Sequence, residues 1–168
     1  EDALLGVGIE RFDYTKGILD RMHGVDALLT AHPELVGRFC FMQAAAPTRS
    51  KLANYQSLQE EAEALAREIN ERHGGPFEAI RLVARHHDPE EVFELFRAAE
   101  LCIVSSLHDG MNLVAKEFVA ARDDEQGVLI LSAFAGASRE LGEARIVNPY
   151  DAYAMGEALY WALTMEEG

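Results

Sequence analysis

Residues 108–117 have the residue types and the spacing of a ligand-binding turn. They follow an apolar run, 101–104, that is typical of a buried strand, and they lead into an amphipathic run, 113–121, that is typical of a helix. Ligands of open α/β sheets bind at such strand-to-helix turns, and the backbone N–H groups at a helix start favour an anion such as a phosphate. The short polar side chains of Asp109 and Asn112 can donate and accept hydrogen bonds beside that anion.

Two acidic side chains of this segment could bind the hydroxyls of a sugar. Asp109 precedes the expected helix and Glu117 lies on it, and a carboxylate accepts hydrogen bonds from neighbouring hydroxyls of a sugar or a ribose. Each also has a structural explanation. Asp109 is followed by Gly110 and suits a turn or a helix N-cap, while Glu117 suits a surface acid beside Lys116. The segment alone leaves both interpretations open.

Two cations follow the first apolar run, residues 4–8. Arg11 and Lys16 stand on the expected loop between this strand and the next helix, at the carboxyl end of the sheet. An arginine can fork onto two phosphate oxygens and a lysine acts as a point charge, so the pair suits a diphosphate. The alternative is that Arg11 pairs with Glu10 or Asp13 on the surface, where ion pairs contribute little.

A third cation, Arg49, stands in the expected loop after the strand at residues 38–43. Small residues, 44–46, precede it and leave room for another group to approach. Arg49 is either part of a second anion site or a solvated loop side chain. The run at residues 86–88, His-His-Asp, matches no standard set of metal ligands, so we expect no metal.

Short apolar runs alternate with amphipathic runs along the whole chain. We expect strands over residues 4–8, 38–43, 80–84, 101–104, 128–131 and 145–147, and helices over 17–31, 52–73, 88–99, 113–121, 136–141 and 151–165. The strand runs are short and mostly not alternating, as parallel strands buried on both faces should be. The pattern predicts an α/β fold with a Rossmann-like, doubly wound parallel sheet in a single domain, 1–168.

The composition excludes several classes of partner. The 168 residues carry a net charge of −14 at pH 7, which repels nucleic acid and anionic membranes, so an anionic ligand needs a local cluster of cations. The sequence contains no signal peptide and no apolar run long enough to span a bilayer. Cys40 and Cys102 lie in strand-like runs and are expected to be buried free thiols, which favours the cytoplasm.

Five segments, taken together and in order, resemble the C-terminal half of the trehalose-6-phosphate synthase family. They are residues 8–17, 43–49, 109–117, 131–136 and 147–151. The resemblance covers almost the whole chain. Members of that family are retaining glycosyltransferases with the GT-B fold, which consists of two Rossmann-like domains, so the resemblance implies that this chain is the C-terminal, donor-binding half.

The resemblance also implies a role for each site residue. Arg11 and Lys16 match the pair that holds the donor diphosphate, and with Asp109 they are the implied catalytic residues. Asp109 matches the acid that binds hydroxyls of the donor glucose, Glu117 the acid on the nucleotide ribose, and Arg49 the arginine on the acceptor phosphate. The backbone that lines the sugar and phosphates is expected at Gly110, Met111, Asn112, Leu113 and Val114.

The implied reaction is transfer of glucose from a nucleotide-glucose, UDP-glucose above all, to glucose 6-phosphate, forming trehalose 6-phosphate with retention and without a cofactor. An N-terminal domain of the same protein would supply much of the acceptor site. The 168 residues are therefore expected to be a fragment of a longer two-domain enzyme and to be inactive alone. Oligomerisation with further copies of the chain stays open.

His108 stands where many members of the family have an arginine, which leaves the acceptor open. One alternative is a related GT-B transferase with another acceptor, either a glucosylglycerol-phosphate synthase or an enzyme that couples a pseudo-sugar. The other is a non-catalytic domain that binds a nucleotide-sugar.

Overall fold

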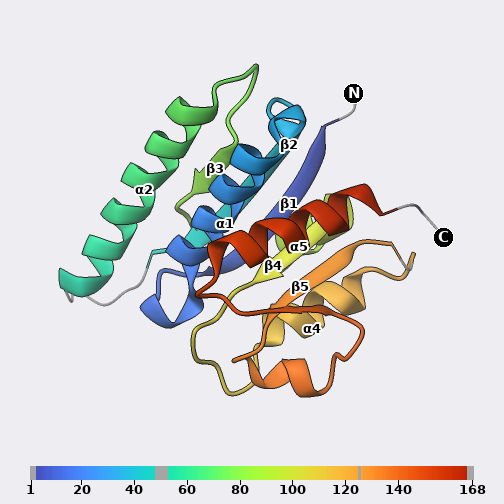
Figure 1. Ribbon diagram of the computed structural model, residues 1–168. Helices are drawn as coiled ribbons and strands as arrows, with labels where there is room; N and C mark the ends of the chain where they lie inside the picture. Colours follow the sequence, from blue (N-terminus) through green and yellow to red (C-terminus); the bar gives the residue numbers. More distant parts are fainter. Residues whose placement is uncertain (1–2, 48–52, 125, 166–168) are drawn as a thin grey trace.

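The computed structural model describes residues 3–47, 53–124 and 126–165 and shows a single parallel sheet flanked by helices (Figure 1). Its strands are β1 (Leu4–Arg11), β2 (Phe39–Ala46), β3 (Ile80–Val83), β4 (Leu101–Val104), β5 (Val128–Ser132) and β6 (Arg145–Val147). The α-helices are α1 (Ile18–Ala31), α2 (Ala53–His73), α3 (Pro89–Ala98), α4 (Leu113–Ala121) and α5 (Ala152–Thr164). Short 3-10 helices are η1 (Tyr14–Lys16), η2 (Pro33–Leu35) and η3 (Gly136–Arg139).

The strands lie in the order β3-β2-β1-β4-β5-β6, and each pairing is parallel. This is the doubly wound Rossmann order, so the predicted fold class is confirmed. The chain builds one half of the sheet outward from β1, then returns to the centre and builds the other half outward from β4. The topological switch point therefore lies between β1 and β4, where ligands of open α/β sheets bind.

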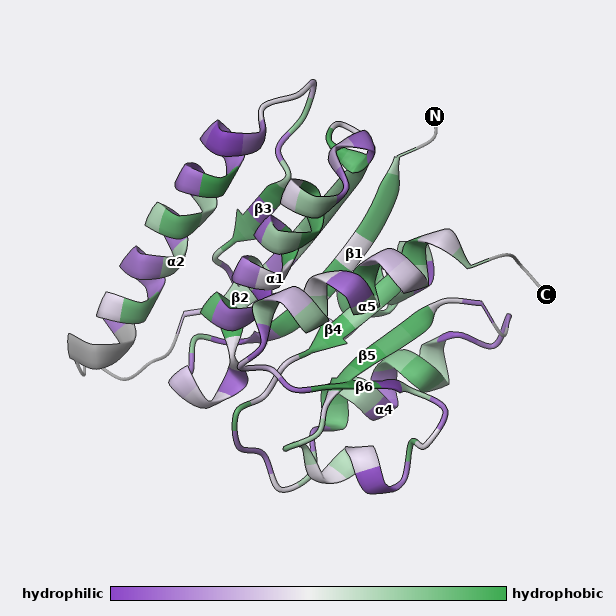
Figure 2. Ribbon diagram, in the orientation of Figure 1, coloured by the Kyte–Doolittle hydropathy of each residue, from purple (hydrophilic) through white to green (hydrophobic). Residues whose placement is uncertain are grey.

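Helices cover both faces of the sheet. Figure 1 shows α1 and α5 in front of the sheet and α4 behind it. One core cluster joins side chains such as Met22 of α1 and Leu159 of α5 to the strands, and a second joins Phe96 of α3 and Phe118 of α4 to the opposite face. Figure 2 shows apolar strands between helices whose outer faces are polar.

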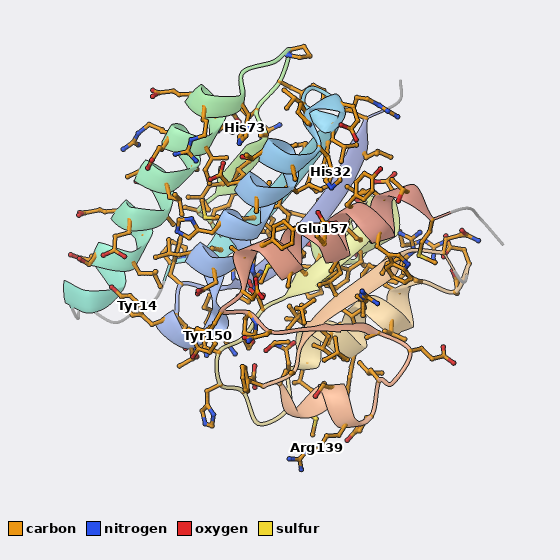
Figure 3. All side chains as sticks on the ribbon, in the orientation of Figure 1. Tyr14, His32, His73, Arg139, Tyr150 and Glu157 are labelled. Atoms are coloured by element: carbon orange, nitrogen blue, oxygen red, sulfur yellow. The ribbon has the colours of Figure 1, made fainter. Side chains whose placement is uncertain are left out.

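A stacked pair of rings, His32 and Tyr160, lies where the end of α1 packs against α5. His32, the C-cap residue that follows α1, stacks on Tyr160 with ring centroids 3.6 Å apart, and its Nε2 lies 3.0 Å from a carboxylate oxygen of Glu157. Figure 3 shows His32 and Glu157 facing each other from the two elements. The helix expected over residues 17–31 is confirmed as α1, and the apolar side chains on its buried face are Ile18, Met22, Val25, Leu28 and Leu29.

Two strands run further than the sequence predicts. β1 continues to Arg11 and β2 to Ala46, and these two residues are register partners at the carboxyl end. Arg11 therefore stands at the end of a strand and not on a loop, and the alanines at 44–46 belong to β2 and not to the loop after it. The strand continues because Glu10, which reads as a loop residue, is buried against Arg21.

Both cysteines are free, with Cys102 buried in β4 and Cys40 half-buried in β2. Burial raises the pKa of each thiol, so both stay protonated at neutral pH. Within the ranges that the structure describes, no helix combines the length and the apolar character that crossing a membrane requires.

Candidate functional site

A cavity of about 520 Å³ opens at the carboxyl ends of the strands, at the switch point between β1 and β4. Seven of the predicted site residues line it: Arg11, Lys16, Asp109, Met111, Asn112, Leu113 and Val114. The remaining lining residues come from the ends of β1, β2 and β3 and from the start of α3: Ile9, Glu10, Ala44, Ala46, Arg85, His86, His87 and Val92. The structure thus brings together residues that are distant in sequence.

Lys16 and Asp109 form an ion pair across this cavity. Lys16 Nζ donates to Asp109 Oδ2 at 2.9 Å, and both side chains are mostly shielded from water. Asp109 also accepts from Asn112 Nδ2 at 3.1 Å and from the backbone N–H of Met111 at 3.2 Å. Partial burial raises the pKa of Asp109, but these donors outweigh it and the pKa is lowered. Asp109 is therefore an ionised acceptor at neutral pH.

The loop after β1 is held rigidly, which fixes where the side chain of Lys16 begins. Asp13 caps η1 by accepting from the backbone N–H and the hydroxyl of Thr15, both at 2.8 Å. Thr15 O accepts from the N–H of Leu107 at 2.8 Å, so this loop is joined to the loop after β4. Gly17 has φ of 66°, and a Cβ there would lie 2.0 Å from the carbonyl oxygen of Ser105.

Arg11 is exposed at the rim of the cavity. Each of its alternative surface partners is engaged elsewhere. Glu10 binds Arg21 at 2.6 Å, and Asp13 caps η1. Arg11 and Lys16 are thus two cations that line the same cavity.

Asn112, and not Asp109, is the N-cap of α4. Its Oδ1 accepts from the N–H of Ala115 at 3.0 Å, and its Nδ2 donates to Ser106 Oγ at 3.3 Å. Its φ of 75° is the one positive value outside glycine among the described residues. Such backbone strain persists only where surrounding contacts over-determine it, and it clusters at functional sites. The cap satisfies the N–H of Ala115, and the first two residues of the helix, Leu113 and Val114, line the cavity.

The turn at residues 109–111 is supported from below by the start of η3. The N–H of Gly136 donates to Asp109 O and the N–H of Ala137 donates to Met111 O, both at 2.8 Å. A Cβ on Gly136 would lie 1.8 Å from the carbonyl oxygen of Gly110, so this close approach requires glycine. Asp109 is thereby fixed by its backbone as well as by its side chain.

Two predicted site residues of the described part of the chain stand apart from this cavity. Glu117 is exposed on α4, one turn beyond Leu113 and outside the cavity lining, and Gly110 is an exposed turn residue. Lys116, which precedes Glu117 in the sequence, pairs with Glu140 at 2.5 Å. Arg49 lies outside the described residues.

The sequence reasoning missed the contribution of the segment after β3. His86 and His87 line the cavity beside Arg85, and Nε2 of His87 is buried without a hydrogen-bond partner in the described part of the chain. Their position at the carboxyl end of a parallel strand is the signal that would have found them. In the ranges that the structure covers, His, Cys, Asp and Glu side chains form no group of three or more that could hold a metal ion.

The switch-point cavity, the cations Arg11 and Lys16 that line it and the capped start of α4 define a Rossmann-like domain with a candidate site at the carboxyl ends of its strands. Residues 2–168 match the model of glycosyltransferase family 20, so the chain belongs to that family. A UDP-forming alpha,alpha-trehalose-phosphate synthase of Pichia angusta is 38% identical over 168 residues, which are 99% of this chain and 35% of the relative. The corresponding enzyme of Candida albicans is 37% identical over 172 residues, 99% of this chain and 35% of the relative.

Solved structures similar to this chain are likewise trehalose-phosphate synthases. An alpha,alpha-trehalose-phosphate synthase from Burkholderia xenovorans superposes with a TM-score of 0.95 at 39% identity, covering 99% of this chain and 38% of that one. A trehalose-6-phosphate structure from E. coli bound with UDP-2-fluoro glucose has the same TM-score and identity over 98% of this chain and 37% of that one. This chain spans about a third of the length of the relatives it matches.

Proposed function

We propose that this chain is the donor-binding domain of a trehalose-6-phosphate synthase. The complete enzyme would transfer glucose from UDP-glucose to glucose 6-phosphate with retention of configuration. The observation that carries the proposal is the Lys16–Asp109 pair at the switch point, beside Arg11 and the start of α4. The names of the relatives, UDP-forming trehalose-phosphate synthases, support the same donor and product.

The cations and the helix start serve the diphosphate. Arg11 and Lys16 provide positive charge in a chain whose net charge is −14, and the N–H groups of Leu113 and Val114 stand at the positive end of the α4 dipole. As the bond to the leaving diphosphate breaks, negative charge grows on its oxygens. Groups already fixed in place stabilise that charge without reorganising, so they lower the barrier.

The acidic residues serve the hydroxyl groups. Asp109, ionised and held by its turn, accepts from hydroxyls of the transferred glucose, while the backbone of residues 110–114 lines the sugar and phosphates. Glu117, exposed one turn further along α4, binds the ribose of a nucleotide that extends beyond the cavity. Arg49 binds the acceptor phosphate.

We propose a front-face displacement, since each carboxylate lining the cavity is already bound to a cation. Glu10 is paired with Arg21, and Asp109 with Lys16, so neither is a free nucleophile. The bond from the anomeric carbon to the diphosphate breaks, and a bond from that carbon to the acceptor hydroxyl oxygen forms on the same face. The hydroxyl proton passes to the leaving phosphate oxygen. This path requires positioning from the protein more than acid–base chemistry.

The acceptor site and the location are also parts of the proposal. The chain spans about a third of its relatives, which supports a fragment of a two-domain enzyme whose N-terminal domain supplies much of the acceptor site. A structure from Burkholderia xenovorans in complex with glucose-6-phosphate supports that acceptor. The free thiols of Cys40 and Cys102 support a cytoplasmic location.

The proposal is tested with the full-length protein that contains these residues. Incubation with UDP-glucose and glucose 6-phosphate should release UDP and trehalose 6-phosphate in equal amounts, and calorimetry should show binding of UDP. GDP and ADP in the same titration test the base preference. Turnover with glycerol 3-phosphate and none with glucose 6-phosphate would identify a different acceptor, and no binding of any nucleotide would refute a donor domain of any kind.

A further inference from the structure

Arg21 is a charged side chain in the core of the domain. It lies on the sheet-facing side of α1 and is 0% exposed. Removing a guanidinium from water is unfavourable, so a buried arginine persists only where its donors and its charge are satisfied. The partners that satisfy Arg21 therefore indicate its role.

Each nitrogen of the Arg21 guanidinium has a partner from a different part of the fold. Nη1 donates to Glu10 Oε2 on β1 at 2.6 Å and to Gln43 Oε1 on β2 at 3.2 Å. Nε donates to Ser105 Oγ, just after β4, at 2.8 Å. Nη2 donates to the backbone carbonyl of Lys16 at 2.9 Å. One side chain thus joins β1, β2 and the residue that follows β4 to Lys16, whose ammonium reaches Asp109.

The network binds two successive backbone carbonyl groups, those of Lys16 and Gly17. Arg21 holds the carbonyl of Lys16, and Ser105 Oγ, which accepts from Arg21, donates to the carbonyl of Gly17 at 2.8 Å. The peptide from which the Lys16 side chain projects is therefore fixed to the buried network. The direction of that side chain toward the cavity depends on Arg21.

The network also controls the charge beneath the cavity. Glu10 borders the cavity, its side chain is 2% exposed, and in the described part of the chain its Oε1 has no hydrogen-bond partner. Without Arg21, this carboxylate would be an uncompensated negative charge below an anion site, in a medium that screens poorly. Arg21 neutralises it and leaves the positive charges of Arg11 and Lys16 effective.

We propose that Arg21 is a positioning residue for diphosphate binding, which acts by fixing the peptide of Lys16 through hydrogen bonds to Lys16 O and Ser105 Oγ. It touches no ligand itself. The inference rests on the proposed function, because the diphosphate is the ligand that Lys16 is taken to bind.

A double-mutant cycle in the full-length protein tests this inference. Arg21→Lys keeps the positive charge but loses the fork, Lys16→Ala removes the ammonium, and UDP affinity is measured for each variant and for the pair. We expect Arg21→Lys to weaken UDP binding about tenfold and the double variant to bind no more weakly than Lys16→Ala alone, since coupled residues are not additive. Independent, multiplying effects would overturn the proposal.

A matched control separates positioning from general stability. Arg122 donates to the carbonyls of Phe96 and Arg97, just before the amino end of β4 and so at the opposite end of the strands, and Arg122→Lys loses comparable backbone hydrogen bonds away from the site. It should leave UDP affinity within about twofold. If Arg21→Lys does not fold, Ser105→Ala replaces it in the cycle, with an expected loss of about threefold that is again absent in the Lys16→Ala background.

Hydrogen exchange distinguishes failure of this inference from failure of the proposed function. If the wild-type protein binds no UDP, the donor-domain proposal fails, but amide exchange over residues 14–17 still reports the rigidity of the peptide. Faster exchange there in Arg21→Lys than in wild type, with no change in Arg122→Lys, supports positioning by Arg21. Unchanged exchange over residues 14–17 overturns it.

Discussion

Lys16 Nζ lies 2.9 Å from Asp109 Oδ2 although the two residues are 93 positions apart in the sequence. They meet because β1 and β4 are neighbours at the centre of the sheet and each ends beside the same cavity. The pair has two consequences for a ligand. It holds both side chains in place, and it sets a carboxylate against the cation that a diphosphate needs.

Asp109→Asn should therefore change the binding of UDP and the transfer of glucose in opposite directions. Removing the negative charge frees Lys16, so UDP alone should bind about threefold tighter, as expected for a partly exposed ion pair. Transfer from UDP-glucose should fall about 10- to 100-fold, because a charge-assisted hydrogen bond to the sugar is lost. Calorimetry and initial rates measure the two effects.

The control for this variant is Asp124→Asn. Asp124 accepts from Arg122 at 3.1 Å beyond the far end of α4, and it should affect neither quantity. Weaker binding of UDP by Asp109→Asn would contradict the competition between the carboxylate and the diphosphate.

The cap at Asn112 should contribute to stability through its side chain and through its backbone conformation. Asn112→Ala removes the capping hydrogen bond but keeps a Cβ at a φ of 75°, so the backbone strain is no longer compensated. We expect the free energy of unfolding to fall by about 2–3 kcal/mol. Asn112→Gly relieves the strain and should cost about 1 kcal/mol. Urea unfolding measures the difference, and equal losses in the two variants would show that the conformation is not strained.

Gly136 and Gly142 form a matched pair that tests the support beneath the turn. A Cβ on Gly136 would lie 1.8 Å from Gly110 O, whereas a Cβ on Gly142 would have no neighbour within 4 Å among the described atoms. Gly136→Ala should displace residues 109–111 and weaken UDP binding about tenfold or more, while Gly142→Ala should leave it within twofold. Similar affinities for the two variants would exclude this supporting role.

The stability of the domain should fall in acid partly through Asp26 on α1. Burial raises the pKa of Asp26, but hydrogen bonds from His73, at 2.7 Å, and from Arg72 outweigh it, so the pKa is lowered (Figure 3 labels His73). A lowered pKa gives stability that is present above the unfolded value, about 3.9, and is lost as the pH falls through the folded value.

Asp26→Asn should accordingly cost about 1 kcal/mol at pH 7, and this deficit should shrink as the pH falls to about 2.5 and the wild-type carboxylate takes up its proton. Urea unfolding at the two pH values measures this. The control is Glu68→Gln, because Glu68 pairs with the same Arg72 at 2.9 Å but at the surface. It should change stability by less than about 0.5 kcal/mol at either pH. An Asp26→Asn deficit that persists in acid would exclude the ionic origin.

The sequence predicts the fold well because buried parallel strands and their helices have patterns that need no tertiary information. The turn from Asp109 to Val114 and the cation Lys16 were found by the same rule, since they follow such strands. The same rule does not predict the roles of Glu10 and Arg21. A charged residue in the sequence indicates the end of a buried strand, and only the three-dimensional structure shows that these two charges neutralise each other inside the core.

A weaker signal for Arg21 was nevertheless present. It lies three residues after Ile18 and four before Val25, on the apolar face of the predicted helix, where an arginine is out of place. The His-His-Asp run suggests metal ligation by its residue types, and this suggestion ignores that His86 and His87 follow a predicted strand, at the carboxyl end of the sheet.

The central strand pairing of the sheet, β1 with β4, is also its shortest, with the fewest residue partners. β1 and β2 are in register from Leu4 to Arg11, whereas β1 and β4 share the partners Gly6↔Leu101 and Val7↔Cys102. A molecule bound by both Lys16 and Asp109 would contact the two halves of the sheet on either side of the β1–β4 pairing. Its binding free energy would stabilise the association of these two halves. The donor would then complete the architecture of the domain as well as occupy it.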